Sequence, residues 1–231
     1  MPTITDEEFG TITLRRSARA SHVRIRVAPD GRLRASLPLY APVFLVKRLI
    51  KTSRDELRQL LNEASGGAVY EHGMRVGKSH TLLVRATSAA SPTAKRHGQQ
   101  ITVSLPTGKT MQHPSVTRAV RDAVAEALRI EAKSYLPKRL AYLAKQGDFS
   151  YEKVRFSHAS GRWGSCSSNG TISLNIALMK LPFELIDYVL VHELAHTVEM
   201  NHSRDFWDLV ETADPDYKHH KKALKNETPS I

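Results

Sequence analysis

The chain has 231 residues, a single cysteine and a net charge of +11 at pH 7, with 41% apolar and 25% charged residues. This composition is ordinary for a soluble globular protein of one large or two small domains. It excludes an internal disulfide, and every apolar run is too short to cross a bilayer. The first residues are acidic and lack the basic-then-apolar order of a secretory signal, so we expect a cytoplasmic protein without a membrane segment.

The N-terminal part is expected to be rich in β structure. Three segments alternate apolar and polar side chains with the period of a half-buried strand: 11–14, 23–27 and 33–37. A Pro-Asp-Gly turn at 29–31 joins the second and third of them. Pro42 then opens a helix that runs to about residue 62, and the glycine pair at 66–67 ends it.

The middle of the chain gives a weaker pattern. Residues 74–84 have strand character with a bend at Gly77, and 101–105 form a second strand segment. Between them, residues 87–100 are small, polar and basic, which predicts a loop. Residues 106–114 form the expected junction to the next part, and no internal repeat is evident.

A long helical pattern begins after this junction. Helix-spaced apolar residues run over 115–135, Pro137 is expected to break or kink the helix, and 138–145 continue it. Two further strands, 154–156 and 171–175, are expected on either side of a segment marked by glycines.

The last part of the chain is expected to be helical before it frays. Pro182 suits the first turn of a helix that is apolar on several sides, as in a buried helix. A short helix over 206–210 should end near Asp214. The basic tail from Lys218 is expected to be frayed, with His219 and His220 solvated.

Basic residues are concentrated in the N-terminal region. Between residues 11 and 54 the only acid is Asp30, and the basic residues are Arg15, Arg16, Arg19, Arg24, Arg26, Arg32, Arg34, Lys47, Arg48, Lys51 and Arg54. They form either a solvated basic face or a surface for a polyanion, that is, nucleic acid or a phosphorylated ligand. No aromatic residues interleave with the arginines, which weakens a single-strand stacking surface.

His192 and His196 stand four residues apart within an apolar helical pattern. Because four residues advance about 400° at about 3.6 residues per turn, both imidazoles project from one face and can share a zinc ion. Glu193, next to the first histidine, can hold the attacking water. The alternative is a pair of hydrogen-bonded core histidines with an exposed glutamate, but burying these groups without a metal would be costly.

The third metal ligand is predicted to be His202, which leaves a fourth position open as a catalytic zinc site requires. The chain must reverse after His196, and Met200-Asn201 is a plausible exit, with Ser203 as cap of the next helix. Glu199 is the rival ligand, one turn beyond His196, and Glu211 is a weaker one.

These residues resemble the YgjP-like metallopeptidases, which are related to the SprT-like zinc proteases. The resemblance rests on the segments Arg162-Trp163-Gly164-Ser165-Cys166-Ser167, 172–175, 188–196, Asn201-His202-Ser203 and Phe206-Trp207. Metzincins share the histidine spacing but have glycine at the position of Glu199, so this is not a metzincin signature.

The resemblance implies an α+β fold in which a zincin-like catalytic domain carries an HExxH active-site helix. His192, His196 and His202 would bind zinc, and Glu193 would be the catalytic base. With the basic, β-rich N-terminal region, this predicts two parts, 1–112 and 113–231. The predicted function is hydrolysis of peptide bonds in a peptide or protein substrate, by Glu-assisted attack of water activated by zinc.

Residues around the motif have several candidate roles. Arg162 is a candidate for contacting substrate or the oxyanion, and Tyr188 is a second oxyanion candidate. Trp163 either contacts substrate or packs in the core. Partners for the second ring nitrogens of the histidines are sought among Asp187, Asn175 and Asp205.

Two alternative functions remain open from the sequence. A metal-dependent hydrolase of nucleotides or other phosphate esters would suit the basic N-terminal region. A SprT-like protease acting on proteins at DNA would use the same region to bind nucleic acid.

Overall fold

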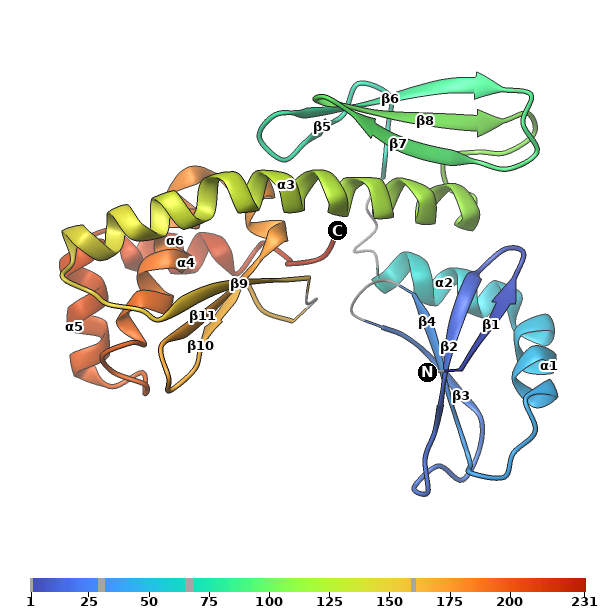
Figure 1. The fold of residues 1–231 in the computed structure, drawn as a ribbon, viewed down its shortest axis with the longest axis horizontal. Coiled ribbons are helices and arrows are strands. Elements are labelled where there is room, and N and C mark those ends of the chain that lie inside the picture. The colour runs from blue at the N-terminus through green and yellow to red at the C-terminus, as the bar shows by residue number, and fades with distance from the viewer. Residues whose placement is uncertain (1, 29–31, 65–68, 159–160) are drawn as a thin grey trace.

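The computed structural model describes residues 2–28, 32–64, 69–158 and 161–231, so the predicted turn at 29–31 and the glycine pair at 66–67 lie outside it. The N-terminal strands are β1 (Thr3–Asp6), β2 (Gly10–Arg16), β3 (Arg24–Val27) and β4 (Leu33–Leu37). They form a sheet in the order β1-β2-β4-β3, in which β2 and β4 are parallel and both edge strands are antiparallel to their neighbours (Figure 1). The strands expected from alternation are thus confirmed, and β1 is added.

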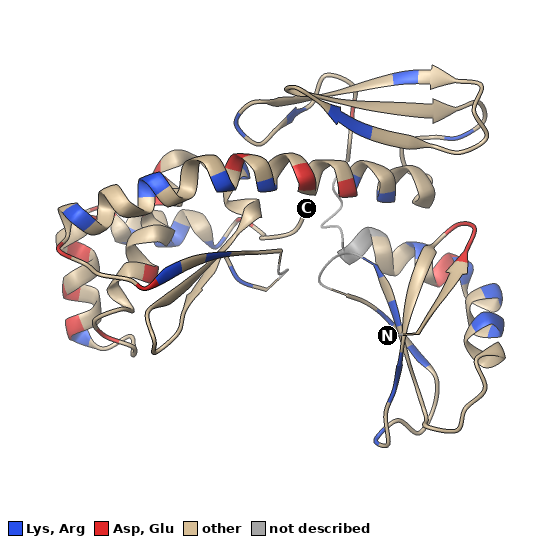
Figure 2. Ribbon diagram, viewed as in Figure 1, with Lys and Arg blue, Asp and Glu red and all other residues tan. Residues whose placement is uncertain are grey.

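Two helices cover one face of this sheet. They are α1 (Phe44–Thr52) and α2 (Arg54–Ala64), whose Val46, Ile50 and Leu57 join the buried strand residues in a small core. The single helix expected over 42–62 is therefore wrong, because Ser53 leaves helical geometry at φ −116° and ψ 33°. In the described part of this unit, basic residues lie along β2, β3, β4 and α1, whereas the acidic residues lie around the β1–β2 turn and in α2 (Figure 2).

The second sheet repeats the arrangement of the first. Its strands are β5 (Arg75–Val76), β6 (His80–Thr87), β7 (Thr93–His97) and β8 (Gln100–Pro106), in the order β5-β6-β8-β7. Again the central pair is parallel and the edge strands are antiparallel to it. The loop predicted over 87–100 is wrong, since β7 lies within it. This edge strand buries little and its residues, Thr-Ala-Lys-Arg-His, give no apolar alternation.

Helix α3 (Pro114–Gln146) is the spine of the molecule, with the second sheet on one side and the third sheet with the C-terminal helices on the other (Figure 1). The break predicted at Pro137 is wrong, because the helix continues through it. Leu136 and Leu140, on either side of that proline, are completely buried. Burial of each stabilises the helix by about 1.5–3 kcal/mol, enough to offset the hydrogen bond that proline removes.

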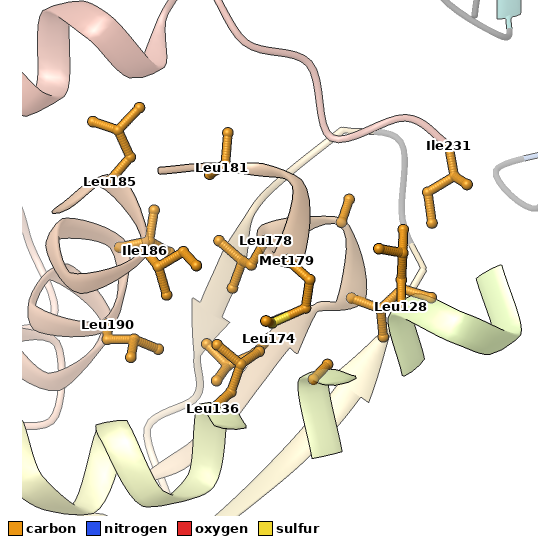
Figure 3. Packing of buried hydrophobic residues seen from close by; sticks show 14 of the residues in the cluster. Leu128, Leu136, Leu174, Leu178, Met179, Leu181, Leu185, Ile186, Leu190 and Ile231 are labelled. Atoms are coloured by element: carbon orange, nitrogen blue, oxygen red, sulfur yellow. The ribbon is translucent and has the colours of Figure 1, made fainter. Parts of the chain in front are cut away.

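The third sheet holds β9 (Lys153–Ser157), β10 (Gly164–Cys166) and β11 (Thr171–Asn175) in the order β10-β11-β9, so β10 is an edge strand. Strand β11 is followed by η1 (Ile176–Lys180), a 3-10 helix, and then by α4 (Phe183–Ala195). Apolar side chains from α3, β11, η1 and α4 interlock between these layers (Figure 3). This packing fixes α4 against the third sheet.

The C-terminal segment is ordered, contrary to the expected frayed tail. Helix α5 (Arg204–Ala213) is followed by α6 (Tyr217–Leu224), which packs on α4. Tyr217 and Ile231 are buried, and Nδ1 of His220 lies 2.8 Å from Asp214 Oδ2. The tail contains the amphipathic helix α6, whose apolar side chains pack against the core despite its many basic residues.

Buried apolar residues of the described chain form two clusters. One lies in the N-terminal sheet with α1 and α2, and the larger one extends from the second sheet through α3 to the C-terminus. The mixed α+β fold is confirmed, and the division into 1–112 and 113–231 stays a prediction. Within the described residues, no helix is long and apolar enough to cross a membrane.

Candidate metal centre

Three histidines meet where α4 ends. His192 lies in the last turn of α4, and His196 occupies its C-terminal cap position. The chain then reverses through residues 197–202, and His202 returns to the end of the helix. Ser203 begins α5 by accepting a hydrogen bond from the Phe206 backbone N–H at 3.3 Å, which confirms the predicted cap. The reversal brings together side chains that are ten residues apart.

The ring nitrogens of the three histidines converge on one point. Each ring offers one nitrogen, and these three atoms lie within 4.8 Å of one another. Nε2 of His192 and Nε2 of His202 are 3.1 Å apart. Two nitrogens on one tetrahedral ion, each bound at about 2.0–2.1 Å, would be separated by roughly 3.3 Å. The arrangement therefore fits a single metal ion.

The remaining ring nitrogens and their surroundings favour neutral imidazoles. Nδ1 of His196 lies 3.1 Å from the Glu199 backbone carbonyl, which leaves Nε2 of this ring available. Burial, with the neighbouring His196 and His202, lowers the pKa of His192 to about 3. A neutral imidazole is the form that binds a metal.

The two rival ligands, Glu199 and Glu211, interact with other groups. The Glu199 carboxylate accepts a hydrogen bond from the Asn201 backbone N–H at 3.0 Å, and Glu211 pairs with Lys218 at 3.1 Å. Neither joins the histidine group.

Glu193 is buried beside the triad. Its side chain is 5% exposed, and Oε2 has no hydrogen-bond partner within the described part of the chain. Burial raises the pKa of this carboxyl to about 8, although the Arg162 guanidinium acts in the opposite direction. A buried carboxylate with an unused oxygen next to a metal-binding group is the arrangement expected of a general base.

Gly164 of β10 makes room for this carboxylate. A Cβ added at position 164 would lie 2.5 Å from Oε1 and 2.8 Å from Cδ of Glu193. Glu193 therefore lies directly against the edge strand, and only glycine leaves it space.

Replacing Gly164 by alanine should displace Glu193 and lower the turnover of peptide substrates, we expect by at least tenfold, with little effect on metal content. Gly161→Ala is the matched control, because a Cβ at position 161 meets nothing within 4 Å. Turnover of a labelled casein by both variants and the parent provides the measurement. Equal turnover in all three would show that Glu193 tolerates the added methyl group.

Comparison with known proteins assigns the family. The model of the YgjP-like metallopeptidase domain matches residues 21–227, most of the chain. The protein belongs to the YgjP-like metallopeptidase family. None of the curated proteins matches it. Among solved structures, the metallopeptidase zymogen abylysin of Pyrococcus abyssi is 27% identical, with 39% of this chain and 92% of that one covered and a TM-score of 0.36.

Membership of this family implies a peptidase that uses a metal ion, and the histidine group is the place in this YgjP-like chain where such an ion fits. The hollow in front of it is lined by β10 and the segment before it, the three histidines, Glu193 and Met200. Arg162 lies in this lining and is exposed, as expected for a residue that contacts substrate. Trp163 packs against the core instead, which favours the packing interpretation.

Asn175 holds the backbone next to the site. It is completely buried; its Nδ2 donates to the Arg162 carbonyl at 2.9 Å, and its backbone N–H donates to the Trp163 carbonyl at 2.8 Å. Its Oδ1 accepts from the Ala177 backbone N–H. Asn175, sought as a partner of the histidines, thus holds the 162–163 backbone at the border of the hollow.

An aromatic stack supports the third histidine. Trp207 of α5 stacks on His202 with ring centroids 5.6 Å apart, and Tyr217 stacks on Trp207 at 5.4 Å. The Lys221 ammonium lies 3.8 Å from the centroid of the Trp207 ring. Sequence reasoning missed Tyr217 and Lys221, because no helix was expected after Asp214 and the tail from Lys218 was expected to fray.

Two other candidates, Asp187 and Tyr188, do not line the hollow. Asp187 forms a bidentate ion pair with Arg139 of α3, at 2.6 and 2.8 Å. Tyr188 is buried, and burial with the nearby Asp214 raises its pKa to about 12; it does not line the hollow. Cys166 lines the hollow, but burial and the Glu193 charge raise the pKa of its thiol, so the reactive thiolate form is disfavoured.

Proposed function

We propose that the protein is a zinc-dependent metallopeptidase, with His192, His196 and His202 as metal ligands and Glu193 as catalytic base. The observation that carries the proposal is the convergence of three imidazole nitrogens beside a buried carboxylate that has an unused oxygen. Three imidazoles suit zinc, although nickel, copper and iron also accept them. Three protein ligands leave a position open for chemistry.

The bound ion would supply Lewis-acid chemistry, polarising a carbonyl and lowering the pKa of water from about 15.7 to about 7. Glu193 Oε2 would accept the proton of the attacking water and return it to the leaving amine. Glu193 is buried, and Oε2 has no hydrogen-bond partner among the described residues, so this oxygen is available to water. Arg162, exposed at the hollow, would donate to substrate carbonyl oxygens.

A peptide would bind in extended form along β10. This strand is at the edge of its sheet and passes directly over Glu193 at Gly164. Pairing with an edge strand supplies main-chain hydrogen bonds that do not depend on the peptide's sequence. The scissile bond would then lie between β10 and the histidine group, within reach of Glu193.

Metal content is the first test. We expect near-stoichiometric zinc in the untagged protein by elemental analysis and a sharp fall in His202→Ala. His219→Ala is the control, since His219 is an exposed histidine in the neighbouring helix. Zinc retained in His202→Ala would show that another residue is the third ligand. No metal in the parent protein after zinc is offered would overturn the proposal.

Phosphate-ester hydrolysis is the alternative that this hollow supports less well. Apart from the histidines, Arg162 is the basic residue in its described lining, whereas a polyphosphate needs several. Phosphate release from a panel of nucleoside triphosphates, compared with cleavage of a peptide library, separates the two chemistries. Release that is lost in Glu193→Gln, without any peptide cleavage, would establish the alternative.

A further inference from the structure

The first sheet has an uncovered face made of arginine, threonine and serine. Alternation along β2, β3 and β4 turns the apolar residues toward α1 and α2, where they form the small core. The opposite face carries Thr13, Arg15, Arg24, Arg26, Arg34 and Ser36. All four arginines are exposed. We call this set the arginine face.

The strand register places these side chains in two rows across the sheet. Ser36 lies between Arg24 and Arg15 in one row, and Arg34 lies between Arg26 and Thr13 in the other. Neighbouring strands are about 4.8 Å apart, and residues two apart on one strand are separated by about 6.8 Å. Arg26 and Arg34 are direct cross-strand neighbours, and like charges placed so are destabilising. Stability alone does not account for this arrangement.

Within the described residues, no acid is paired with the arginine face. Across the described chain, none of its four arginines forms an ion pair. The acids Asp6 and Glu8 instead form ion pairs with Arg54 and Arg58 of α2. Figure 2 shows the described acidic residues of this unit around the β1–β2 turn and on α2. The loop after β2 adds Arg19 and His22 to a hollow that Arg15, Arg24 and Arg26 also line. The hollow is thus open and positive, and its described lining contains no acidic residue.

We propose that the arginine face binds the phosphate backbone of double-stranded nucleic acid. Guanidinium groups match phosphate oxygens in a bidentate geometry, and the hydroxyls of Thr13 and Ser36 add further donors between them. Nucleic-acid interfaces are polar and strongly positive, whereas protein interfaces have an apolar centre that these rows lack.

The same rows disfavour other polyanionic partners. No phenyl, phenol or indole ring lines the described hollow, so single strands gain no stacking there. Peripheral membrane binding needs apolar anchors as well as charge, and the exposed Leu39, Tyr40 and Phe44 stand beyond the end of β4, outside the rows. The binding is independent of the peptidase activity and holds whether or not the histidine group carries a metal.

Fluorescence anisotropy with a labelled duplex of about 25 base pairs, in salt from about 50 to 200 mM, tests the proposal. We expect Arg15→Gln/Arg24→Gln/Arg26→Gln/Arg34→Gln to weaken binding at least tenfold. The slope of log K against log salt should fall in magnitude by roughly 3 to 4, because each phosphate that an arginine neutralises releases about 0.9 counterions. The double variant Arg24→Gln/Arg26→Gln should show about half of this change in slope.

The matched control removes the same charge elsewhere. Arg129→Gln/Lys133→Gln/Lys138→Gln/Lys145→Gln changes four exposed positions of α3. It should retain most of the affinity. Equal weakening in both quadruple variants would show a response to net charge alone and overturn the proposal. So would tighter binding of the single strand, absence of duplex binding, or capture only by vesicles containing phosphatidylserine.

Discussion

Replacing Glu193 by glutamine should lower peptidase turnover by about 10³-fold while metal content stays unchanged. Glutamine has nearly the same shape as glutamate and fills the same space against Gly164. It cannot accept the proton of the attacking water, and the three imidazoles that would bind the metal are not altered. A loss of turnover without loss of metal assigns the residue to proton transfer.

The measurement is cleavage of a peptide library followed by mass spectrometry, together with elemental analysis of the same samples. Glu211→Gln serves as the control, because it removes one carboxylate from the neighbouring helix α5, where Glu211 pairs with the exposed Lys218. Full activity in Glu193→Gln would contradict the assigned role. Loss of metal together with activity would make Glu193 a structural support of the site.

The sequence located the histidine group because helix geometry alone relates His192 to His196. It favoured His202 over Glu199 as the third ligand, because an imidazole at a chain turn matches the usual ligand preference of zinc. It could not show that the Glu199 backbone carbonyl faces His196, or that Gly164 lies against Glu193. Those contacts depend on how the third sheet docks on α4, which no local pattern encodes.

The fold was predictable where one face of an element is buried. Strands β2, β4 and β11 alternate visibly, whereas β7 is a polar edge strand and gave no signal. The sequence also did not reveal that the first two sheets have the same strand order. Their strands share a pattern of burial and direction, with little identity of residues. Pro137 was misleading because local propensity is weaker than the burial of its neighbours.

Glu131 of α3 joins the second sheet to the helix spine. Its side chain is 7% exposed and accepts four hydrogen bonds: from Lys78 N at 2.7 Å, Ser79 N at 2.9 Å, Ser79 Oγ at 2.7 Å and His80 Nδ1 at 2.6 Å. Gly77 allows this close approach, since a Cβ there would lie 2.1 Å from Oε2. One carboxylate therefore orders the whole β5–β6 turn against α3.

Glu131→Gln should lower the free energy of unfolding by roughly 3 kcal/mol, because an amide group would face donors that now share a carboxylate. Urea denaturation followed by circular dichroism measures the loss. Glu126→Gln is the control on the same helix, where the carboxylate is 61% exposed. Equal stability of the two variants would mean that the buried hydrogen bonds contribute nothing net.

The same contact predicts a pH dependence. Burial alone would raise the pKa of Glu131, but the hydrogen bonds from Lys78, Ser79 and His80 outweigh it and hold the pKa below its ordinary value of 4.5. A carboxyl with a lowered native pKa stabilises the fold above its unfolded pKa, and this contribution is lost as the pH falls through the native pKa. The parent should therefore lose stability below about pH 4.5 more steeply than Glu131→Gln. Parallel stability curves for the two proteins would show that the native and unfolded pKa values of Glu131 are the same.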